Sequence, residues 1–163
     1  YSMTGNAGAN ALSSGSGNNT LTGGAGNDTL NGGDGNDSLI GGTGNDSLTG
    51  GTGLDSFYFD TALGSTNIDS IADFTAGLDR IYLSKAIFKA LPENAGQNLN
   101  PAEFSQGAFS SGQFANNYII YNTSTGALYY DADGNGVGAA VQIALIGASI
   151  HPTLAYTDFS VIA

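Results

Sequence analysis

A nine-residue repeat covers the first third of the chain and limits its possible folds more than any other feature. Six copies follow one another without a gap over residues 5–58. The fourth position is glycine in every copy, and the eighth is leucine in five copies and phenylalanine in the last. A flexible Gly/Ser linker has no reason to keep a large apolar residue at one position of each period. The period therefore predicts ordered repeats that stack on one another.

Each repeat combines a glycine-rich turn with a short strand. Glycine at the first, second and fourth positions permits positive φ angles and a tight turn. The last three residues are polar, apolar and polar, which predicts a short strand with one side chain pointing inward. These inward side chains are Leu12, Leu21, Leu30, Leu39, Leu48 and Phe57.

The sixth position carries asparagine in the first two repeats and aspartate in the next four. If two repeats form one turn of a roll, each loop stacks on the loop 18 residues away. One edge then carries Asn10, Asp28 and Asp46, and the other carries Asn19, Asp37 and Asp55. A calcium ion between stacked loops would receive carboxylate and carbonyl oxygens, and about six to eight such ligands suit calcium.

The best-supported sites pair Asp28 with Asp46, and Asp37 with Asp55. Sites that use Asn10 or Asn19 lose one negative charge and should bind calcium more weakly. We expect several calcium ions in total. The full predicted ligand set is Gly23, Gly24, Ala25, Gly26, Asp28, Gly32, Gly33, Asp34, Gly35, Asp37, Gly41, Gly42, Thr43, Gly44, Asp46, Gly50, Gly51, Thr52, Gly53, Asp55, Asn10, Asn19, Asp69 and Asp73.

The repeats have too little apolar surface to fold by themselves. Ordering each backbone residue costs about 1–2 kcal/mol, and only one side chain in nine points inward. Stacked carboxylates without a cation would also repel one another. The repeats should therefore be disordered without calcium and should fold when calcium binds, because binding to the folded state alone stabilises that state.

These repeats closely resemble the calcium-binding nonapeptides of RTX proteins, the haemolysin-type family. Residues 67–84 also resemble the D-x-I-x-D-F … G-x-D-x-I-x-L segment that closes many RTX rolls. If the nine-residue frame is continued, Asp73 falls at a sixth position and could face Asp55 across a last calcium ion, with Asp69 as a further candidate. A surface aspartate that caps a turn is the alternative. Asp79 is interpreted as a turn residue before a strand.

The remaining sequence predicts short β elements with one or two helical turns. Residues 86–91 could form a short helical piece that ends before a proline. Asn100 to Glu103 have the pattern of an N-cap, a proline at the first helical position and a capping-box glutamate. Residues 118–121 and 127–130 predict a hairpin, and residues 139–146 predict a further strand.

The loop at residues 131–136 has two interpretations. Asp131, Asp133 and Asn135 have the one, three, five spacing of an EF-hand loop. The glycine is out of place and the twelfth position is Gln142 rather than glutamate, which favours an ordinary hairpin turn over a calcium loop.

Two further segments resemble the C-terminal regions of RTX proteins that are exported by type I secretion. They are the hairpin at residues 128–147 and the Asp-Phe-plus-apolar ending at residues 158–163. The resemblance implies a type I exporter as a partner, an uncleaved C-terminal signal and a secreted, extracellular protein. The predicted fold is all-β: a right-handed parallel β-roll over residues 1–60, with a β-rich capping and secretion-signal region over residues 61–163 packed on it as one unit.

Composition excludes several classes of partner. The net charge is −11, with only three lysines and arginines, so nucleic acid, anionic membranes and polyanions are disfavoured. No apolar run reaches the roughly 18 residues that a membrane helix needs, so membrane insertion is not expected. There is no cysteine, and His151 is the only histidine. No catalytic motif is present, so we expect no enzyme activity here, and any catalytic domain would lie upstream.

Three functions agree with these features. The first is a calcium-binding RTX module that folds outside the cell and supports type I secretion and the stability of a larger secreted protein. The second is a calcium-rigidified adhesion, surface-layer or glycan-binding module, and the third is an accessory module of a secreted hydrolase or epimerase. An ice-binding roll is disfavoured because it needs a regular outward row of threonines or asparagines, and Thr43 and Thr52 are too few.

Overall fold

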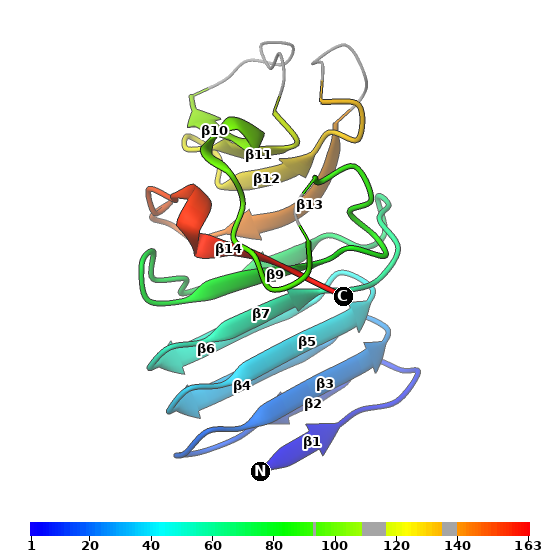
Figure 1. The fold of residues 1–163 in the computed structure, drawn as a ribbon. Helices are drawn as coiled ribbons and strands as arrows, with labels where there is room; N and C mark the ends of the chain where they lie inside the picture. Colours follow the sequence, from blue (N-terminus) through cyan, green and yellow to red (C-terminus); the bar gives the residue numbers. More distant parts are fainter. Residues whose placement is uncertain (93, 109–116, 135–139) are drawn as a thin grey trace.

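The computed structural model describes residues 1–92, 94–108, 117–134 and 140–163, and it is built almost entirely from β-strands. Among these residues the strands form two sheets (Figure 1). The first sheet has the order β1 (Ser2–Thr4), β3 (Thr20–Ala25), β5 (Ser38–Thr43), β7 (Ser56–Phe59), β9 (Arg80–Ser84) and β14 (Phe159–Ile162). The second has the order β10 (Phe104–Gly107), β11 (Ile119–Asn122), β12 (Ala127–Tyr130), β13 (Val141–Ile146), β8 (Asp69–Ile71), β6 (Ser47–Thr52), β4 (Thr29–Asp34) and β2 (Ala11–Ser13).

Successive repeats alternate between the two sheets, and all strand pairs within the repeats are parallel. In the first sheet Leu21 pairs with Leu39, which pairs with Phe57. In the second sheet Leu30 pairs with Leu48. Each layer therefore lies 18 residues after the one it stacks on. The predicted parallel β-roll with a β-rich cap is confirmed.

The strands of the roll are longer than the sequence predicts. β5 and β6 each have six residues, because the first three residues of the next repeat continue the strand. The second and fourth glycines of a repeat have positive φ, as predicted: φ is 102° at Gly42 and 132° at Gly44. The first glycine, Gly41, does not have positive φ, so backbone conformation does not explain why this position is glycine.

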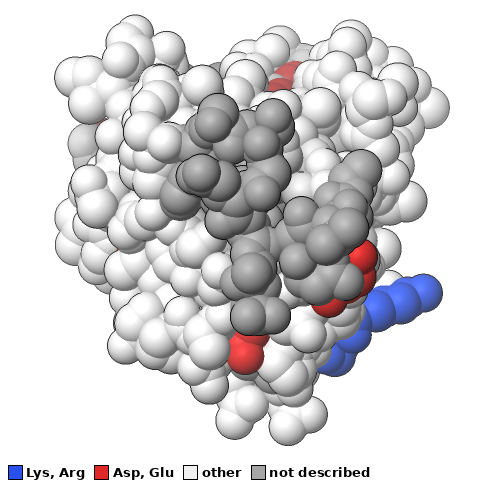
Figure 2. Space-filling view, turned by 90° about the horizontal axis from the view of Figure 1, so that it is seen from above, with Lys and Arg blue, Asp and Glu red and all other residues white. Residues whose placement is uncertain are grey.

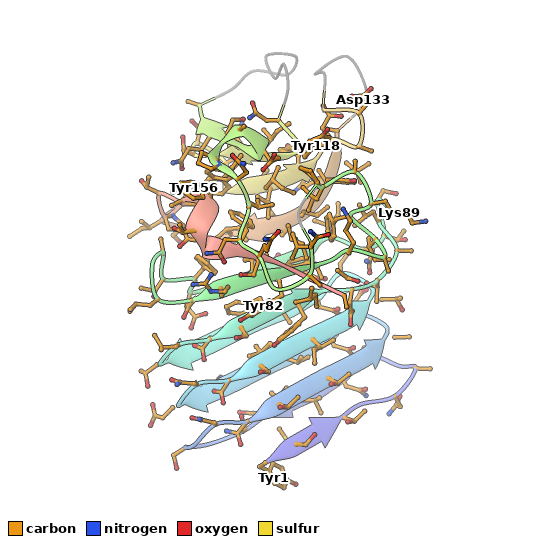
Figure 3. The ribbon with its side chains drawn as sticks, in the orientation of Figure 1. Tyr1, Tyr82, Lys89, Tyr118, Asp133 and Tyr156 are labelled. Atoms are coloured by element: carbon orange, nitrogen blue, oxygen red, sulfur yellow. The ribbon has the colours of Figure 1, made fainter. Side chains whose placement is uncertain are left out.

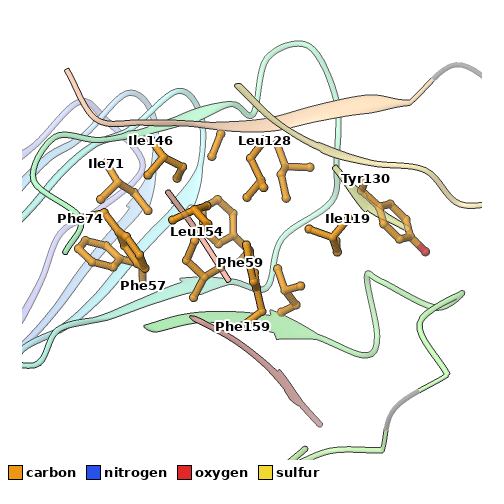
Figure 4. Close-up of a cluster of buried hydrophobic side chains, with 14 of the residues drawn as sticks. Phe57, Phe59, Ile71, Phe74, Ile119, Leu128, Tyr130, Ile146, Leu154 and Phe159 are labelled. Carbon is orange, nitrogen blue, oxygen red and sulfur yellow. The ribbon is translucent and has the colours of Figure 1, made fainter. Parts of the chain in front are cut away.

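The inward side chains form one continuous hydrophobic core. Leu30, Leu39 and Phe57 are fully buried, whereas Leu12 in the first layer is only half-buried because no layer lies beneath it. The core continues from the roll into the cap (Figure 4). The cap side chains in Figure 4 include Ile71, Phe74, Ile119, Leu128, Ile146, Leu154 and Phe159.

Both sheets continue from the repeats into the cap. In the second sheet β8 lies between β6 and β13. In the first sheet β7 pairs with β9, and β9 pairs in parallel with the C-terminal strand β14. Strand pairing therefore crosses the predicted boundary at residue 60 in both sheets. Tyr1 lies at one end of the stack and Asp133 at the other (Figure 3).

The predicted cap elements are present with one exception. Residues 119–122 and 127–130 form an antiparallel hairpin that continues into β13. Pro101–Glu103 form a 3-10 helix with Asn100 as its N-cap and a capping box. The prediction of a helical piece at residues 86–91 is wrong, because these residues form turns that bury Phe88 and Leu91 completely.

Two of the three residues of the EF-hand-like pattern, Asp131 and Asp133, lie in the described part of the chain. Asn135 falls outside the described residues. Asp131 is buried, and its Oδ1 accepts a hydrogen bond from Asp133 N at 3.2 Å. This contact is the usual pattern of an aspartate in a turn, in keeping with the hairpin interpretation.

Candidate calcium sites in the turns

A ladder of aspartates runs along each edge of the roll. Asp46 Oδ1 accepts a hydrogen bond from the backbone of Asp28 at 2.8 Å, and Asp55 Oδ1 accepts one from Asp37 at 2.9 Å. Each carboxylate is thus held by the turn of the layer before it. The first layers are joined in the same way by bonds from Asn10 N to Asp28 Oδ1 and from Asn19 N to Asp37 Oδ1, both 2.7 Å. The structure therefore brings together the residues that were predicted to share each edge.

The second oxygen of these carboxylates has no hydrogen-bond partner. Within the described part of the chain, Oδ2 of Asp28, Asp37, Asp46 and Asp55 is buried and unpaired. A buried, unpaired acceptor costs about 1–3 kcal/mol, and a charged one costs more. Native proteins rarely leave such atoms without a hydrogen-bond partner or a bound ion. These oxygens consequently fit a bound cation, and the regular spacing provides one such oxygen in each of four repeats.

The first-position glycine of each repeat makes room beside this oxygen. A Cβ atom at Gly23 would overlap both Asp28 Oδ2 and the carbonyl oxygen of Gly41, one layer further on. Gly32 is enclosed in the same way by Asp37 Oδ2 of its own repeat and the carbonyl oxygen of Gly50, one layer further on. A carboxylate oxygen of one layer and a carbonyl oxygen of the next therefore both lie next to the space that the missing Cβ leaves. Such hard oxygen ligands suit calcium. The described residues contain no group of three acidic or histidine side chains that could hold a metal ion by themselves.

Asparagine at the sixth position behaves differently from aspartate. Asn19 Nδ2 donates a hydrogen bond to the carbonyl oxygen of Gly17 at 2.5 Å. The side chain thus pairs within its own turn, where an aspartate would present an unpaired oxygen. This local bond gives a structural reason for the weaker metal site expected at Asn19.

Burial makes the aspartates of the last layers hard to ionise without a cation. Burial, together with the nearby charges of Asp79, Asp37 and Asp73, raises the pKa of Asp55 to about 6, although the hydrogen bond from the Asp37 amide lowers it. Burial and the charge of the stacked Asp28 likewise raise the pKa of Asp46. A divalent cation would lower these pKa values by favouring the charged form.

The layer after the repeats does not follow the predicted frame. Asp69 Oδ1 accepts from Asp46 N at 3.0 Å, so Asp69 extends the edge of Asp46 and does not join Asp55. Asp79, interpreted as a turn residue, is the one that faces Asp55, with its Oδ1 3.0 Å from Asp55 N. The sequence separation in these pairs is 23 and 24 residues instead of 18. The extra residues move the frame, so Asp79 occupies the ladder position that the extrapolated frame gave to Asp73.

Asp73 lies beside this edge but has a different set of contacts. Its two oxygens accept from Gly50 N at 2.9 Å and Gly51 N at 2.8 Å, so it caps the preceding turn. Asp79 also uses both oxygens, the second accepting from Thr75 N at 2.7 Å. Neither therefore shares the unpaired oxygen of the repeat aspartates. A better signal was present in the sequence, because residues 78–81 repeat the Leu-Asp-polar-apolar order of residues 54–57.

The other predicted ligands lie in the turns themselves. The second- and fourth-position glycines of stacked repeats contact one another, and a Cβ at Gly42 would overlap the Gly24 carbonyl oxygen. Third-position side chains lie on the outside: Asp34 is exposed, and its Oδ1 accepts from Thr52 Oγ1 at 3.0 Å. Such residues could contribute only backbone carbonyl oxygens to a metal in the turn. Ala25 and Thr43 occupy the equivalent positions on the other edge, where they pair with each other.

A model of the RTX calcium-binding nonapeptide repeat, in four copies, matches residues 4–39 and 31–62 of the chain. The match covers the repeat aspartates of both ladders, including the four whose Oδ2 atom is buried and unpaired. Residues 4–62 are RTX calcium-binding repeats. Calcium binding is accordingly a property of these repeats.

The solution structure of the AlgE6R3 subunit from the Azotobacter vinelandii mannuronan C5-epimerase is similar to this chain. The identity is 23%, the TM-score is 0.55, and the similarity covers 94% of this chain and 78% of that chain. At this identity the similarity supports the β-roll fold alone. No curated protein sequence matches this chain.

The surface of the chain carries few positive charges, because the sequence has only three lysines and arginines. Seen from the cap end, acidic side chains show at several places and basic atoms gather at one side (Figure 2). Arg80 is committed to the fold: its guanidinium donates to Asn98 Oδ1, the Thr157 carbonyl oxygen and Ser160 Oγ at 2.8–3.2 Å. In the described part of the chain no helix is long and apolar enough to cross a bilayer.

Proposed function

We propose that this chain is a calcium-dependent folding module of a larger secreted protein. It stays unfolded where calcium is scarce, folds outside the cell and supports export by a type I system. The observation that carries this proposal is the row of buried, unpaired Oδ2 atoms at Asp28, Asp37, Asp46 and Asp55. Without a cation these oxygens favour the unfolded chain, in which water can solvate them.

The geometry suggests which atoms hold each ion. Asp28 Oδ2 and the Gly41 carbonyl oxygen form one pair of ligands, and Asp37 Oδ2 and the Gly50 carbonyl oxygen form the equivalent pair on the other edge. Each pair joins two layers, so an ion bound there links them. When the free calcium concentration is 100 times the Kd of a site, binding at that site stabilises the folded state by about 2.7 kcal/mol.

Circular dichroism with and without calcium tests the folding role. We expect little β signal in a chelator and a strong gain on adding calcium, together with resistance to proteolysis. Isothermal titration calorimetry should count several ions per chain. Magnesium is the matched control, because it retains its water shell and prefers a strict octahedral site. Equal compactness and protease resistance in chelator and in calcium would refute the proposal.

The export role needs a separate experiment. It is supported by the resemblance of residues 158–163 to the ending of type I substrates, and these residues include β14, which pairs with β9 in the folded chain. Co-expression with a type I exporter should release the chain into the medium, and exchanging Phe159 and Val161 for serine should stop release. Release that is independent of the exporter would contradict this role while leaving calcium-dependent folding intact.

An accessory module of a polysaccharide-modifying enzyme is the second candidate. It is favoured by the similarity to the epimerase subunit, which covers the cap as well as the repeats, 94% of the chain in all. Binding of mannuronan oligomers, measured with and without calcium and against a neutral glucan, tests it. The net charge of −11 opposes binding of a polyanion, so calcium-independent binding is not expected.

A further inference from the structure

The fifth position of the repeat carries a second hydrogen-bond ladder. Asn36 N and Leu54 N donate to Asn18 Oδ1 and Asn36 Oδ1 at 2.9 and 3.0 Å. On the other edge, Asn45 N and Ile68 N donate to Asn27 Oδ1 and Asn45 Oδ1 at 3.0 and 2.8 Å. We propose that these asparagines are positioning residues, which hold stacked turns at the separation that a shared calcium ion requires. The inference rests on the proposed calcium-dependent folding.

The asparagine and aspartate ladders run in opposite directions. Asn36 in the earlier layer accepts from the amide of Leu54 in the later layer, whereas Asp55 in the later layer accepts from the amide of Asp37 in the earlier one. Two adjacent residues of one turn are thus tied to two adjacent residues of the next by a reciprocal pair of bonds. These two hydrogen bonds fix the distance between the two stacked turns beside the unpaired Asp37 Oδ2.

The end of the ladder shows that this amide needs an acceptor. The last repeat has Leu54 at the fifth position, which has no oxygen to offer the following layer. The corresponding amide there, that of Leu78, bonds instead to the Thr75 carbonyl oxygen at 3.1 Å. On the other edge Asn45 bonds to Ile68 N, so the ladder reaches from the last stacked repeat into the cap.

The fifth-position side chains contribute little to the hydrophobic core. Asn18, Asn27, Asn36 and Asn45 are all exposed, so burial of apolar surface does not explain them. Asparagine supplies a neutral acceptor, whereas aspartate would add a charge one residue from the metal-facing carboxylate. Leucine or alanine would leave the facing amide dependent on water.

Two substitutions at Asn36 and one control test this role in the full chain. Asn36→Leu removes the acceptor, and Asn36→Asp keeps one. Asn31→Leu is the control, because Asn31 is an exposed asparagine whose side chain makes no hydrogen bond among those found in the described residues. With calcium alone as the ligand, isothermal titration calorimetry gives the affinities, and hydrogen exchange reports on the Leu54 amide.

For Asn36→Leu we expect faster hydrogen exchange of the Leu54 amide. We also expect roughly fivefold weaker calcium binding, which is the change in affinity that corresponds to the loss of one net hydrogen bond. The weakening should be confined to ions on the Asp37 edge, whereas a general loss of stability would weaken both edges. Asn36→Asp should restore Leu54 protection and most of the affinity. Equal affinities for Asn36→Leu and Asn31→Leu, or no rescue by aspartate, would overturn the inference. Failure of the wild-type chain to fold with calcium would instead refute the proposed function.

Discussion

Replacing Asp37 by asparagine should have opposite effects with and without calcium. In the variant, Nδ2 takes the place of the buried, unpaired Oδ2. It can donate to a turn carbonyl, as Asn19 Nδ2 does to Gly17. Removing the unpaired acceptor should stabilise the metal-free fold by about 1–3 kcal/mol. The same change removes a calcium ligand, so up to about 2.7 kcal/mol of stabilisation is lost at calcium concentrations near 100 times Kd.

Urea unfolding in two buffers measures both effects. The metal-free measurement needs an osmolyte such as trimethylamine N-oxide, which favours compact states and populates the folded chain. Asp34→Asn is the matched control, because it makes the same charge change at an exposed side chain of the same repeat. The reasoning is refuted if Asp37→Asn destabilises the metal-free fold, or if it leaves the number of bound calcium ions unchanged.

Three further predictions concern pH, the first-position glycines and the C-terminal strand. Burial raises the pKa of Asp55 to about 6 and of Asp69 to about 7, so between about pH 4 and 7 the folded state holds protons that the unfolded state has released. The metal-free fold, populated by the same osmolyte, should therefore lose β signal as pH rises through this window, whereas calcium affinity should rise because protons compete for the same carboxylates; dichroism that is flat in chelator and osmolyte from pH 4 to 7 would contradict this. Gly41→Ala places a Cβ on the carboxylate of its own repeat and should cost about 1–3 kcal/mol in calcium-loaded unfolding, whereas Gly64→Ala, with open space around it, should be neutral. Asp158→Ala leaves two backbone amides without a charged acceptor and should cost about 1.5–3 kcal/mol, with faster hydrogen exchange in β14 than in β3.

The repeats could be predicted because one period sets both register and chemistry. A strict nine-residue period makes each layer repeat the last, so pairing Leu30 with Leu48 also stacks Asp28 on Asp46. The inward core and the two acidic edges therefore followed from counting residues. The length of the strands did not, because the Gly-Gly pair of the next repeat reads as a turn although it continues the strand.

The rest of the site could not be found by counting. Once the layer separation changes from 18 to 24 residues, only local order identifies Asp79 as the partner of Asp55. Asn36 and its equivalents were overlooked because an exposed asparagine in a glycine-rich turn is ordinarily a solvated residue. Residues 86–91 have a helical composition, but two buried apolar side chains hold them in turns. In each case tertiary contacts decide between locally similar alternatives.

The alternation of repeats between two sheets also restricts how the roll can change in length. Gain or loss of two nonapeptides would add or remove a complete layer and leave every other strand in its sheet. Gain or loss of one would move all the preceding strands to the opposite sheet and exchange the two edges. Loss of the repeat that follows Asn10, for example, would place Asn10 over Asp37 rather than over Asp28, its present partner. Natural variation in the number of repeats should therefore proceed in steps of 18 residues.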